Sequence, residues 1–371
     1  MLESRWALRL GLPVVGLLGV ALVVTASAAS NAGPKTLADC RSAPAFASAV
    51  PAQPASLRGE AWFRVDPILD ERSTLAGQRL VAGLHAGRRL TVDLAPEAFA
   101  AGPVGDVVLF GTDDGVRSET FALDVRRGCV VSLAVEQDVV RSATLAPGGD
   151  SVFEHRVDRA TRRDLGVFRR PLDGGGAVRV VEPLEADPRF GPTFTTELVW
   201  SADGARLAIQ SCGAVLCRTR VLHLETGVIA RLGGEGHGPV IGLAGDKVVT
   251  YVACPGLPCP VVATSLTTGS TATLADVSGL AVLAFSDGPR LVHETAGDPT
   301  TVRVVAFDGT VERTIALPRG RRLMATGARS SSGARSPHGF VLATADGRAG
   351  NPAAFVVGLD GAAVEISEVL R

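Results

Sequence analysis

The stretch that decides the fold is residues 197–232, ELVWSADGARLAIQSCGAVLCRTRVLHLETGVIARL. It contains four β-type runs, at 197–200, 206–210, 218–224 and 228–232. Asp, Gly, Ser and Thr, which favour chain reversal, lie between these runs. The stretch therefore predicts one antiparallel sheet of four consecutive strands, which is the blade of a β-propeller.

The same pattern repeats with an offset of 42 residues. Two C-x4-C pairs and the Thr-Gly turns that follow them share this offset, namely Cys212 and Cys217 with Gly227, and Cys254 and Cys259 with Gly269. Similar turns close β-type runs at Gly128, Gly174, Gly309 and Gly361. One sheet cannot bury both of its faces, whereas sheets stacked in a ring do so. We therefore predict an all-β protein, a β-propeller of four-stranded antiparallel blades over residues 59–371.

The number of blades depends on the segment from about Gly59 to Ala101. It holds three more β-type runs, AWFRV, QRLVAGL and RRLTVDL. These runs either form a seventh, degenerate blade or complete a six-bladed ring by closing against the C-terminus. Seven blades give a spacing near 45 residues, which is usual for propellers, and are favoured.

The first residues resemble an export signal. Arg5 and Arg9 precede an apolar run from Leu10 to Val24, and small residues follow it. This order predicts a signal peptide over residues 1–28, cleaved after Ala28, and a secreted, periplasmic or cell-surface protein. The alternative is an uncleaved signal-anchor, which would be the chain's one link to a membrane. Residues 29–58 are rich in Ala, Pro and Ser and are expected to form a flexible tail.

Six cysteines follow the export signal, and an even number in an exported chain predicts disulfides. Each C-x4-C pair lies where one strand turns into the next, and opposed strand residues are close enough for a disulfide. We therefore pair Cys212 with Cys217 and Cys254 with Cys259, which leaves Cys40 to pair with Cys129. The alternative is that the four clustered cysteines bind one zinc ion as thiolates.

One blade carries a recognisable signature. Residues 198–208, LVWSADGARLA, resemble the W-S-x-D-G-x-x-L-A core of WD40-like repeats, as in the periplasmic TolB family, and LETG at 224–227 resembles the turn that closes them. The resemblance implies a propeller scaffold, but it implies no activity, because propellers host binding proteins, peptidase lids and lyases alike.

The sequence offers few candidates for chemistry. It lacks the common catalytic, phosphate-binding and metal-binding motifs, so we predict no catalytic residue, cofactor or metal ligand. His237, which we expect in a loop between blades, is the best single candidate for a functional histidine. Asp113 and Asp114 could bind a cation with their paired carboxylates, although an Asp-Asp-Gly sequence equally suits a tight turn.

These observations lead to three functional hypotheses. The first is a non-enzymatic, monomeric scaffold that binds a protein, a peptide or a cell-envelope ligand. The second is a hydrolase or lyase whose active site is assembled from several blades at the central channel. The third is a membrane-tethered structural or assembly component. A formal net charge of −1 gives no basic surface, which argues against nucleic acid as a partner.

Overall fold

A computed structural model describes fifteen ranges of the chain: 61–72, 74–84, 89–104, 106–172, 175–184, 195–201, 203–213, 217–232, 237–252, 258–285, 288–295, 297–317, 322–323, 340–344 and 354–365. The predicted signal peptide and tail lie outside these ranges. Within them the chain forms strands and turns, and none of their residues belongs to a helix that could cross a membrane.

The strands pair into seven antiparallel sheets, which we call A to G in chain order. Sheet A contains β1 (Ala61–Leu69), β2 (Leu75–Leu84) and β3 (Arg89–Leu94); sheet B contains β4 (Phe99–Val104), β5 (Val107–Asp113), β6 (Ser118–Asp124) and β7 (Cys129–Glu136); sheet C contains β8 (Val139–Leu145), β9 (Ser151–Val157), β10 (Asp164–Pro171) and β11 (Val178–Val181); and sheet D contains β12 (Thr195–Trp200), β13 (Arg206–Cys212), β14 (Cys217–His223) and β15 (Ile229–Arg231).

The remaining three sheets repeat the four-stranded pattern. Sheet E contains β16 (His237–Ala244), β17 (Lys247–Val252), β18 (Cys259–Ser265) and β19 (Thr271–Val277); sheet F contains β20 (Ala281–Phe285), β21 (Pro289–Thr295), β22 (Asp298–Ala306) and β23 (Val311–Ala316); and sheet G contains β24 (Arg322–Leu323), β25 (Phe340–Thr344), β26 (Ala354–Gly358) and β27 (Ala363–Glu365). In each four-stranded sheet the strands pair in the order in which they occur in the chain, as predicted for residues 197–232.

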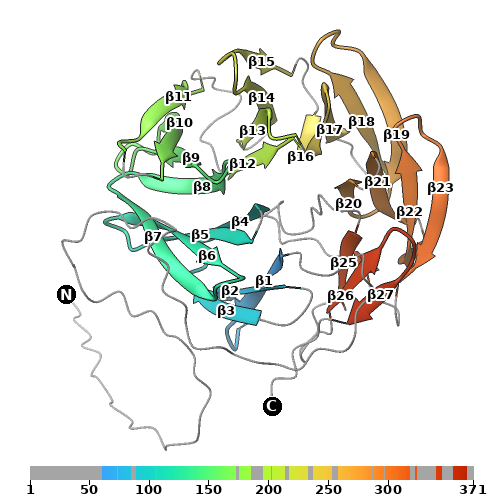
Figure 1. Cartoon of the computed structure of the whole chain (residues 1–371), viewed down its shortest axis with the longest axis horizontal. Helices are drawn as coiled ribbons and strands as arrows, with labels where there is room; N and C mark the ends of the chain where they lie inside the picture. The colour runs from blue at the N-terminus through green and yellow to red at the C-terminus, as the bar shows by residue number, and fades with distance from the viewer. Residues whose placement is uncertain are drawn as a thin grey trace, which may run out of the picture.

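The sheets are arranged radially, as in a β-propeller. Figure 1 shows them around a central axis, with β4, β8, β12, β16 and β20 toward the centre and β11, β15, β19 and β23 at the rim. The inner strands follow one another around the axis, because β4 contacts β8, β8 contacts β12, β12 contacts β16 and β16 contacts β20. The predicted all-β propeller is thus confirmed.

The repeated Thr-Gly turn has a backbone explanation. Gly227 and Gly269 have φ angles of 68° and 70°, in the left-handed region that glycine adopts without steric cost. The N–H of Gly227 donates to His223 O at 2.8 Å, and that of Gly269 donates to Ser265 O at 2.9 Å. Each glycine therefore closes the hairpin between the third and fourth strands of its sheet.

Apolar side chains, both aromatic and aliphatic, fill the spaces between neighbouring sheets. Between sheets C and D, Phe153 packs edge-on against Trp200 with ring centroids 5.1 Å apart, and the indole N–H of Trp200 donates to Thr144 Oγ1 at 3.0 Å. Leu207 and Ile209 are fully buried in the same cluster. The apolar runs of the sequence thus form the inter-sheet core, because each sheet buries both faces.

Sheet A differs from the others because it has three strands. β3 is separated from β4, the inner strand of sheet B, by residues 95–98 alone, so it takes the outermost position of its sheet. β1 and β2 then correspond to the second and third strands of the other sheets. Within the described residues β1, β2 and β3 pair with one another and with no strand of sheet G.

Antiparallel order gives the ring two different ends. The connections between the second and third strands of the sheets, and those from one sheet to the next, lie at one end, which we call the hairpin end. The other connections lie at the opposite, turn end. Contacts between neighbouring sheets agree with this: Arg206 donates to Gly245 O at 2.5 Å at the turn end, and Arg159 donates to Asp113 at the hairpin end.

Candidate functional site

The hairpin end is the polar end of the ring. In sheets B to F the second strand has an apolar stretch nearer the turn end, and polar residues follow it toward the hairpin end. The polar residues at these strand ends are Thr112 and Asp113 in β5, Glu154, His155 and Arg156 in β9, Gln210 and Ser211 in β13, Thr250 in β17, and His293 and Glu294 in β21. This repeated polarity makes the hairpin end the candidate functional site.

Side chains at this end connect sheets B, D and E to the inner strand of the next sheet. Ser118 accepts a hydrogen bond from Val140 N at 3.1 Å, Gln210 accepts from Val240 N at 3.0 Å, and Tyr251 accepts from Ala281 N at 2.7 Å. An inner strand has an open edge toward the axis, and its N–H groups need acceptors once they are buried. The polar side chains therefore pair these N–H groups and hold neighbouring sheets together.

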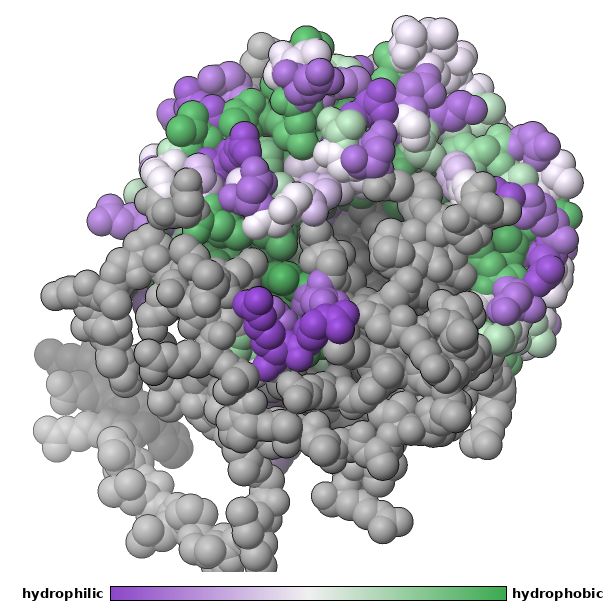
Figure 2. Space-filling model, viewed as in Figure 1, coloured by the Kyte–Doolittle hydropathy of each residue, from purple (hydrophilic) through white to green (hydrophobic). Residues whose placement is uncertain are grey.

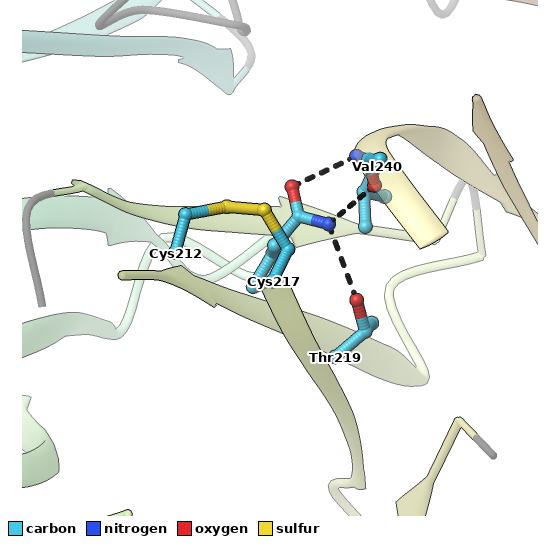
Figure 3. The surroundings of a disulfide bond; sticks show 6 residues. Cys212, Cys217, Thr219 and Val240 are labelled. Carbon is cyan, nitrogen blue, oxygen red and sulfur yellow. Dashed lines mark hydrogen bonds between the residues drawn. A yellow bond between two sulfur atoms is a disulfide. The ribbon is translucent and has the colours of Figure 1, made fainter. Parts of the chain in front are cut away.

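One predicted disulfide closes the β13–β14 hairpin, two residues from the inter-sheet contact of Gln210. Cys212 and Cys217 are opposed in the β13–β14 register and form a disulfide with Cα atoms 4.0 Å apart. Figure 3 shows the disulfide together with Thr219 and Val240. Gln210, on the same strand as Cys212, donates its amide N–H groups to Gly238 O at 2.7 Å and to Thr219 Oγ1 at 3.3 Å. The pairing predicted from the C-x4-C spacing is confirmed, and it occupies two of the four thiols that the zinc alternative needs.

The other predicted disulfides involve cysteines outside the described residues. Cys129, at the start of β7, and Cys259, at the start of β18, are both disulfide-bonded. Cys40 and Cys254, their expected partners, lie outside the described ranges. The pairings of Cys40 with Cys129 and of Cys254 with Cys259 therefore stay predictions.

Asp113 and Asp114 both have structural partners. Asp113 accepts two hydrogen bonds from the Arg159 guanidinium, each 2.8 Å long, and further ones from Ser118 and Gly115 N. Burial raises the pKa of Asp113, but these hydrogen bonds and the charge of Arg159 outweigh it and bring the pKa to about 2. Asp114 accepts from the N–H groups of Val116 and Arg117, which lower its pKa, and thereby shapes the β5–β6 turn.

His237 lies elsewhere than expected. It is the first residue of β16 and not a loop residue, and its register partner is Val252 on β17. The side chain is partly buried, and its Nδ1 is 3.1 Å from Thr250 Oγ1. Five residues, 232–236, separate β15 from β16, so the strand begins earlier than the Gly-His-Gly sequence suggests.

A charged network between sheets B and C is absent from the sequence-based candidates. Arg156 donates to Glu136 Oε2 at 2.8 Å and to Glu154 Oε2, and its guanidinium lies 4.5 Å above the Phe168 ring. Arg170 pairs with Glu136 from the other side. Glu154 is fully buried, and this burial raises its pKa although Arg156 opposes the shift.

A buried histidine lies on the opposite face of β9. His155 Nε2 is 2.9 Å from Asp164 Oδ1, and neither side chain is more than 7% exposed. Asp164 also accepts from Gly166 N and Leu184 N. Burial raises the pKa of Asp164, but His155 and these N–H groups lower it by more. The net pKa is therefore below the usual value, and the carboxylate stays ionised. The run Glu154-His155-Arg156 in an otherwise apolar strand was the available signal, because buried charges need partners.

The described residues contain no group of three or more His, Cys, Asp or Glu side chains placed to hold a metal ion. The described part of the face in Figure 2 carries hydrophilic and hydrophobic residues side by side. The arrangement at the hairpin end thus consists of inter-sheet connections and ion pairs.

Comparisons with known proteins show the fold. No protein-family model and no curated protein matches the chain. Among solved structures, the propeller domain of the trilobed protease from Pyrococcus furiosus is 12% identical, with a TM-score of 0.54 over 88% of this chain and 98% of that one. A prolyl endopeptidase is 14% identical, with a TM-score of 0.55 over 83% of this chain and 50% of that one.

TolB from Acinetobacter baumannii is also similar, at 16% identity and a TM-score of 0.47 over 69% of this chain. The chain spans 63% of the length of TolB and half of the prolyl endopeptidase. Identities this low carry information on architecture and none on activity. The chain is therefore a β-propeller, and it shares this fold with the propeller domain of the trilobed protease and with the prolyl endopeptidase.

Proposed function

We propose that this chain is an exported, non-enzymatic scaffold whose hairpin end binds a protein, a peptide or a cell-envelope ligand. The observation that supports the proposal is the bracing of this end. Arg159 joins the hairpins of sheets B and C, Gln210 joins sheets D and E, and a disulfide closes the β13–β14 hairpin. Loops held in place before binding lose little conformational entropy on binding.

We also propose that the seven sheets are seven blades of one ring. The short connection from β3 to β4, residues 95–98, supports this count, because it links sheet A to the next sheet as the last strand of a complete blade does. A seven-bladed ring presents its hairpins around one rim, which is the surface that a scaffold uses.

The enzyme hypothesis has one arrangement in its favour, the His155–Asp164 pair. A histidine held by a carboxylate is the base of many hydrolases. His155 is 0% exposed, however, so a substrate could reach it only after sheets C and D separate. We therefore keep binding as the proposed function.

Site-specific photo-crosslinking from the two ends tests the proposal. Val116, in the β5–β6 hairpin, is 69% exposed, and Val228, at the turn end, is 59% exposed. Each would be replaced in turn by a photo-reactive phenylalanine in cells that produce the protein naturally. We expect a discrete crosslinked species from position 116 and much less of it from position 228.

Val228 is a matched control, because both positions carry an exposed valine in a hairpin. Equal yields from both ends, or crosslinks from position 228 alone, would contradict the proposed binding surface. A Cys212→Ser/Cys217→Ser variant adds a second readout. Because it loosens the neighbouring hairpin, we expect a weaker crosslink from a probe placed at Arg218.

Export and the disulfides can be tested by intact mass. We expect the exported protein to have the mass of residues 29–371 and to gain six alkyl groups after reduction and none before. Alkylation without reduction would contradict the disulfides, and a retained N-terminus would indicate the membrane-tethered alternative.

A further inference from the structure

The interface between sheets C and D changes character along its height. Toward the turn end it is filled by Phe153, Leu198, Leu207 and Ile209. Toward the hairpin end the same faces of the same strands carry polar residues. On β9 the change occurs between Phe153 and His155, and on β13 it occurs between Ile209 and Ser211.

Strand register places these polar side chains on facing surfaces. In sheet C, His155 follows Phe153 on the same face of β9, and Ser142 is its register partner on β8. In sheet D, Ser211 follows Ile209 on the same face of β13, and Thr196 is opposite Ser211 on β12. Side chains directly opposed on a sheet lie about 5 Å apart, so each surface presents adjacent polar groups.

Arg220, on β14, adds a charged side chain to these polar groups. It is the register partner of Ile209 on β14, and its side chain is 6% exposed. One guanidinium nitrogen, Nη1, donates to Glu182 O, which follows β11 of sheet C. The side chain therefore bridges the two sheets.

Six buried polar atoms in this interface have no hydrogen-bond partner within the described part of the chain. They are Ser142 Oγ, His155 Nδ1, Thr196 Oγ1, Ser211 Oγ, and Nε and Nη2 of Arg220. His155 and Ser211 are 0% exposed, and Thr196 is 6% exposed. Buried polar atoms almost always have partners, so unpaired ones gathered in one interface indicate a missing group.

The chemistry of the five atoms other than His155 Nδ1 identifies that group as an acceptor. The nitrogens of Arg220 can only donate, and each of the three hydroxyls can also donate. Asp164 is already used by His155 and by two backbone N–H groups. Burial lowers the pKa of Arg220, the Asp164 carboxylate raises it, and the Arg231 cation lowers it. Among these three groups two cations face one carboxylate, so a single negative charge would balance them.

We propose that the polar half of this interface binds a small monovalent inorganic anion, of the size of chloride, held mainly by Arg220 with the hydroxyls of Ser211 and Thr196. The anion would pair the donors that the protein leaves unpaired and would hold sheets C and D together at the hairpin end. This role is independent of what the outer surface binds.

Bromide is the probe, because it substitutes for chloride and scatters X-rays anomalously. Crystals of the full chain grown in sodium bromide are expected to show an anomalous peak within hydrogen-bond distance of Arg220 and Ser211. Thermal unfolding is measured in parallel in sodium chloride and in sodium gluconate at equal ionic strength. We expect a higher unfolding midpoint in chloride.

Three variants separate binding from general stability. Arg220→Met is expected to lose both the bromide peak and the chloride response. Ser211→Ala, which leaves Arg220 in place, is expected to need about tenfold more chloride for half of the response, since it loses one hydrogen bond to a charged group. Arg313→Met removes an exposed arginine that donates to Leu359 O at 3.0 Å, and it should respond to chloride as the unmodified protein does.

Two results from the bromide crystals would overturn the proposal. The first is a water molecule in the interface with no anomalous signal. The second is bromide bound at surface arginines alone, which would mean an adventitious ion only. Equal unfolding midpoints in chloride and gluconate would overturn it as well. If Arg220→Met does not fold, Ser211→Ala and the bromide crystals of the unmodified protein still decide.

Discussion

Replacement of Arg156 by methionine is expected to lower the free energy of unfolding by about 3–5 kcal/mol at neutral pH, the usual cost of removing one partner from a buried ion pair. Arg156 is 5% exposed and donates to both Glu136 and Glu154. Without it, the described cation that remains near the buried carboxylate of Glu154 is Arg170, whose Nε is 4.0 Å away. Urea unfolding of the variant and the unmodified protein measures the difference.

The pH dependence of this loss identifies its cause. Burial already raises the pKa of Glu154, and removal of Arg156 raises it further. A folded-state pKa above the unfolded value means that the charged form destabilises the fold, and that protonation relieves this as the pH falls. The loss should therefore be smaller at pH 5 than at pH 8.

A double variant, Arg156→Met/Glu154→Leu, serves as the control. It removes the stranded carboxylate with its partner, so we expect it to recover most of the lost stability. A double variant no more stable than Arg156→Met would show that packing against Phe168, and not the charge of Glu154, carries the effect. A loss below about 1 kcal/mol in the single variant would contradict the buried-network interpretation.

The sequence predicts the sheets well because turns and strands are encoded locally. Glycine at a left-handed position, as at Gly227, marks a hairpin wherever it recurs, and the apolar runs between such turns are the strands. The Cys212–Cys217 disulfide follows in the same way, since four intervening residues place the two cysteines opposite each other across a hairpin.

The contacts between sheets are less accessible to sequence reasoning, because their partners are far apart in the chain. Arg159 and Asp113 are 46 residues apart and meet only when sheets B and C pack. The period of the repeat locates the hairpins but does not tell which side chain reaches the next sheet. Trp200 and Thr144, 56 residues apart, illustrate the same point.

The candidate site was predicted only in part for a related reason. Glu154, His155 and Arg156 occupy a strand of a sheet that is buried on both faces, so their charges have to be paired. The pattern therefore indicates an internal polar network, whereas single residues in apparent loops, such as His237, attract attention first. Its partners Glu136, Asp164 and Arg170 come from two other strands, β7 and β10, and cannot be identified from spacing.

Replacement of Asp113 by asparagine is expected to cost about 2 kcal/mol near pH 6, which is the free energy that corresponds to a pKa lowered from 3.8 to about 2. Asp113 accepts hydrogen bonds from two guanidinium nitrogens of Arg159, and this ion pair joins the hairpins of sheets B and C. An asparagine offers one acceptor oxygen and no charge, so the two-bonded ion pair is lost.

This contribution has a defined pH window. The folded-state pKa lies below the unfolded one, so the carboxylate stabilises the fold above about pH 4, and this stability disappears as the pH falls toward 2. The unmodified protein and the Asp113→Asn variant should thus differ by about 2 kcal/mol at pH 6 and by almost nothing at pH 2. Urea unfolding at half-unit pH steps measures this difference.

Asp114→Asn is the neighbouring control. Asp114 is exposed and accepts backbone N–H groups of the β5–β6 turn, and an asparagine oxygen can accept them as well. We expect this variant to stay close to the unmodified protein at every pH. If both variants lost the same stability, the turn and not the Arg159 ion pair would account for the effect, and the bracing between sheets B and C would be weaker than the geometry indicates.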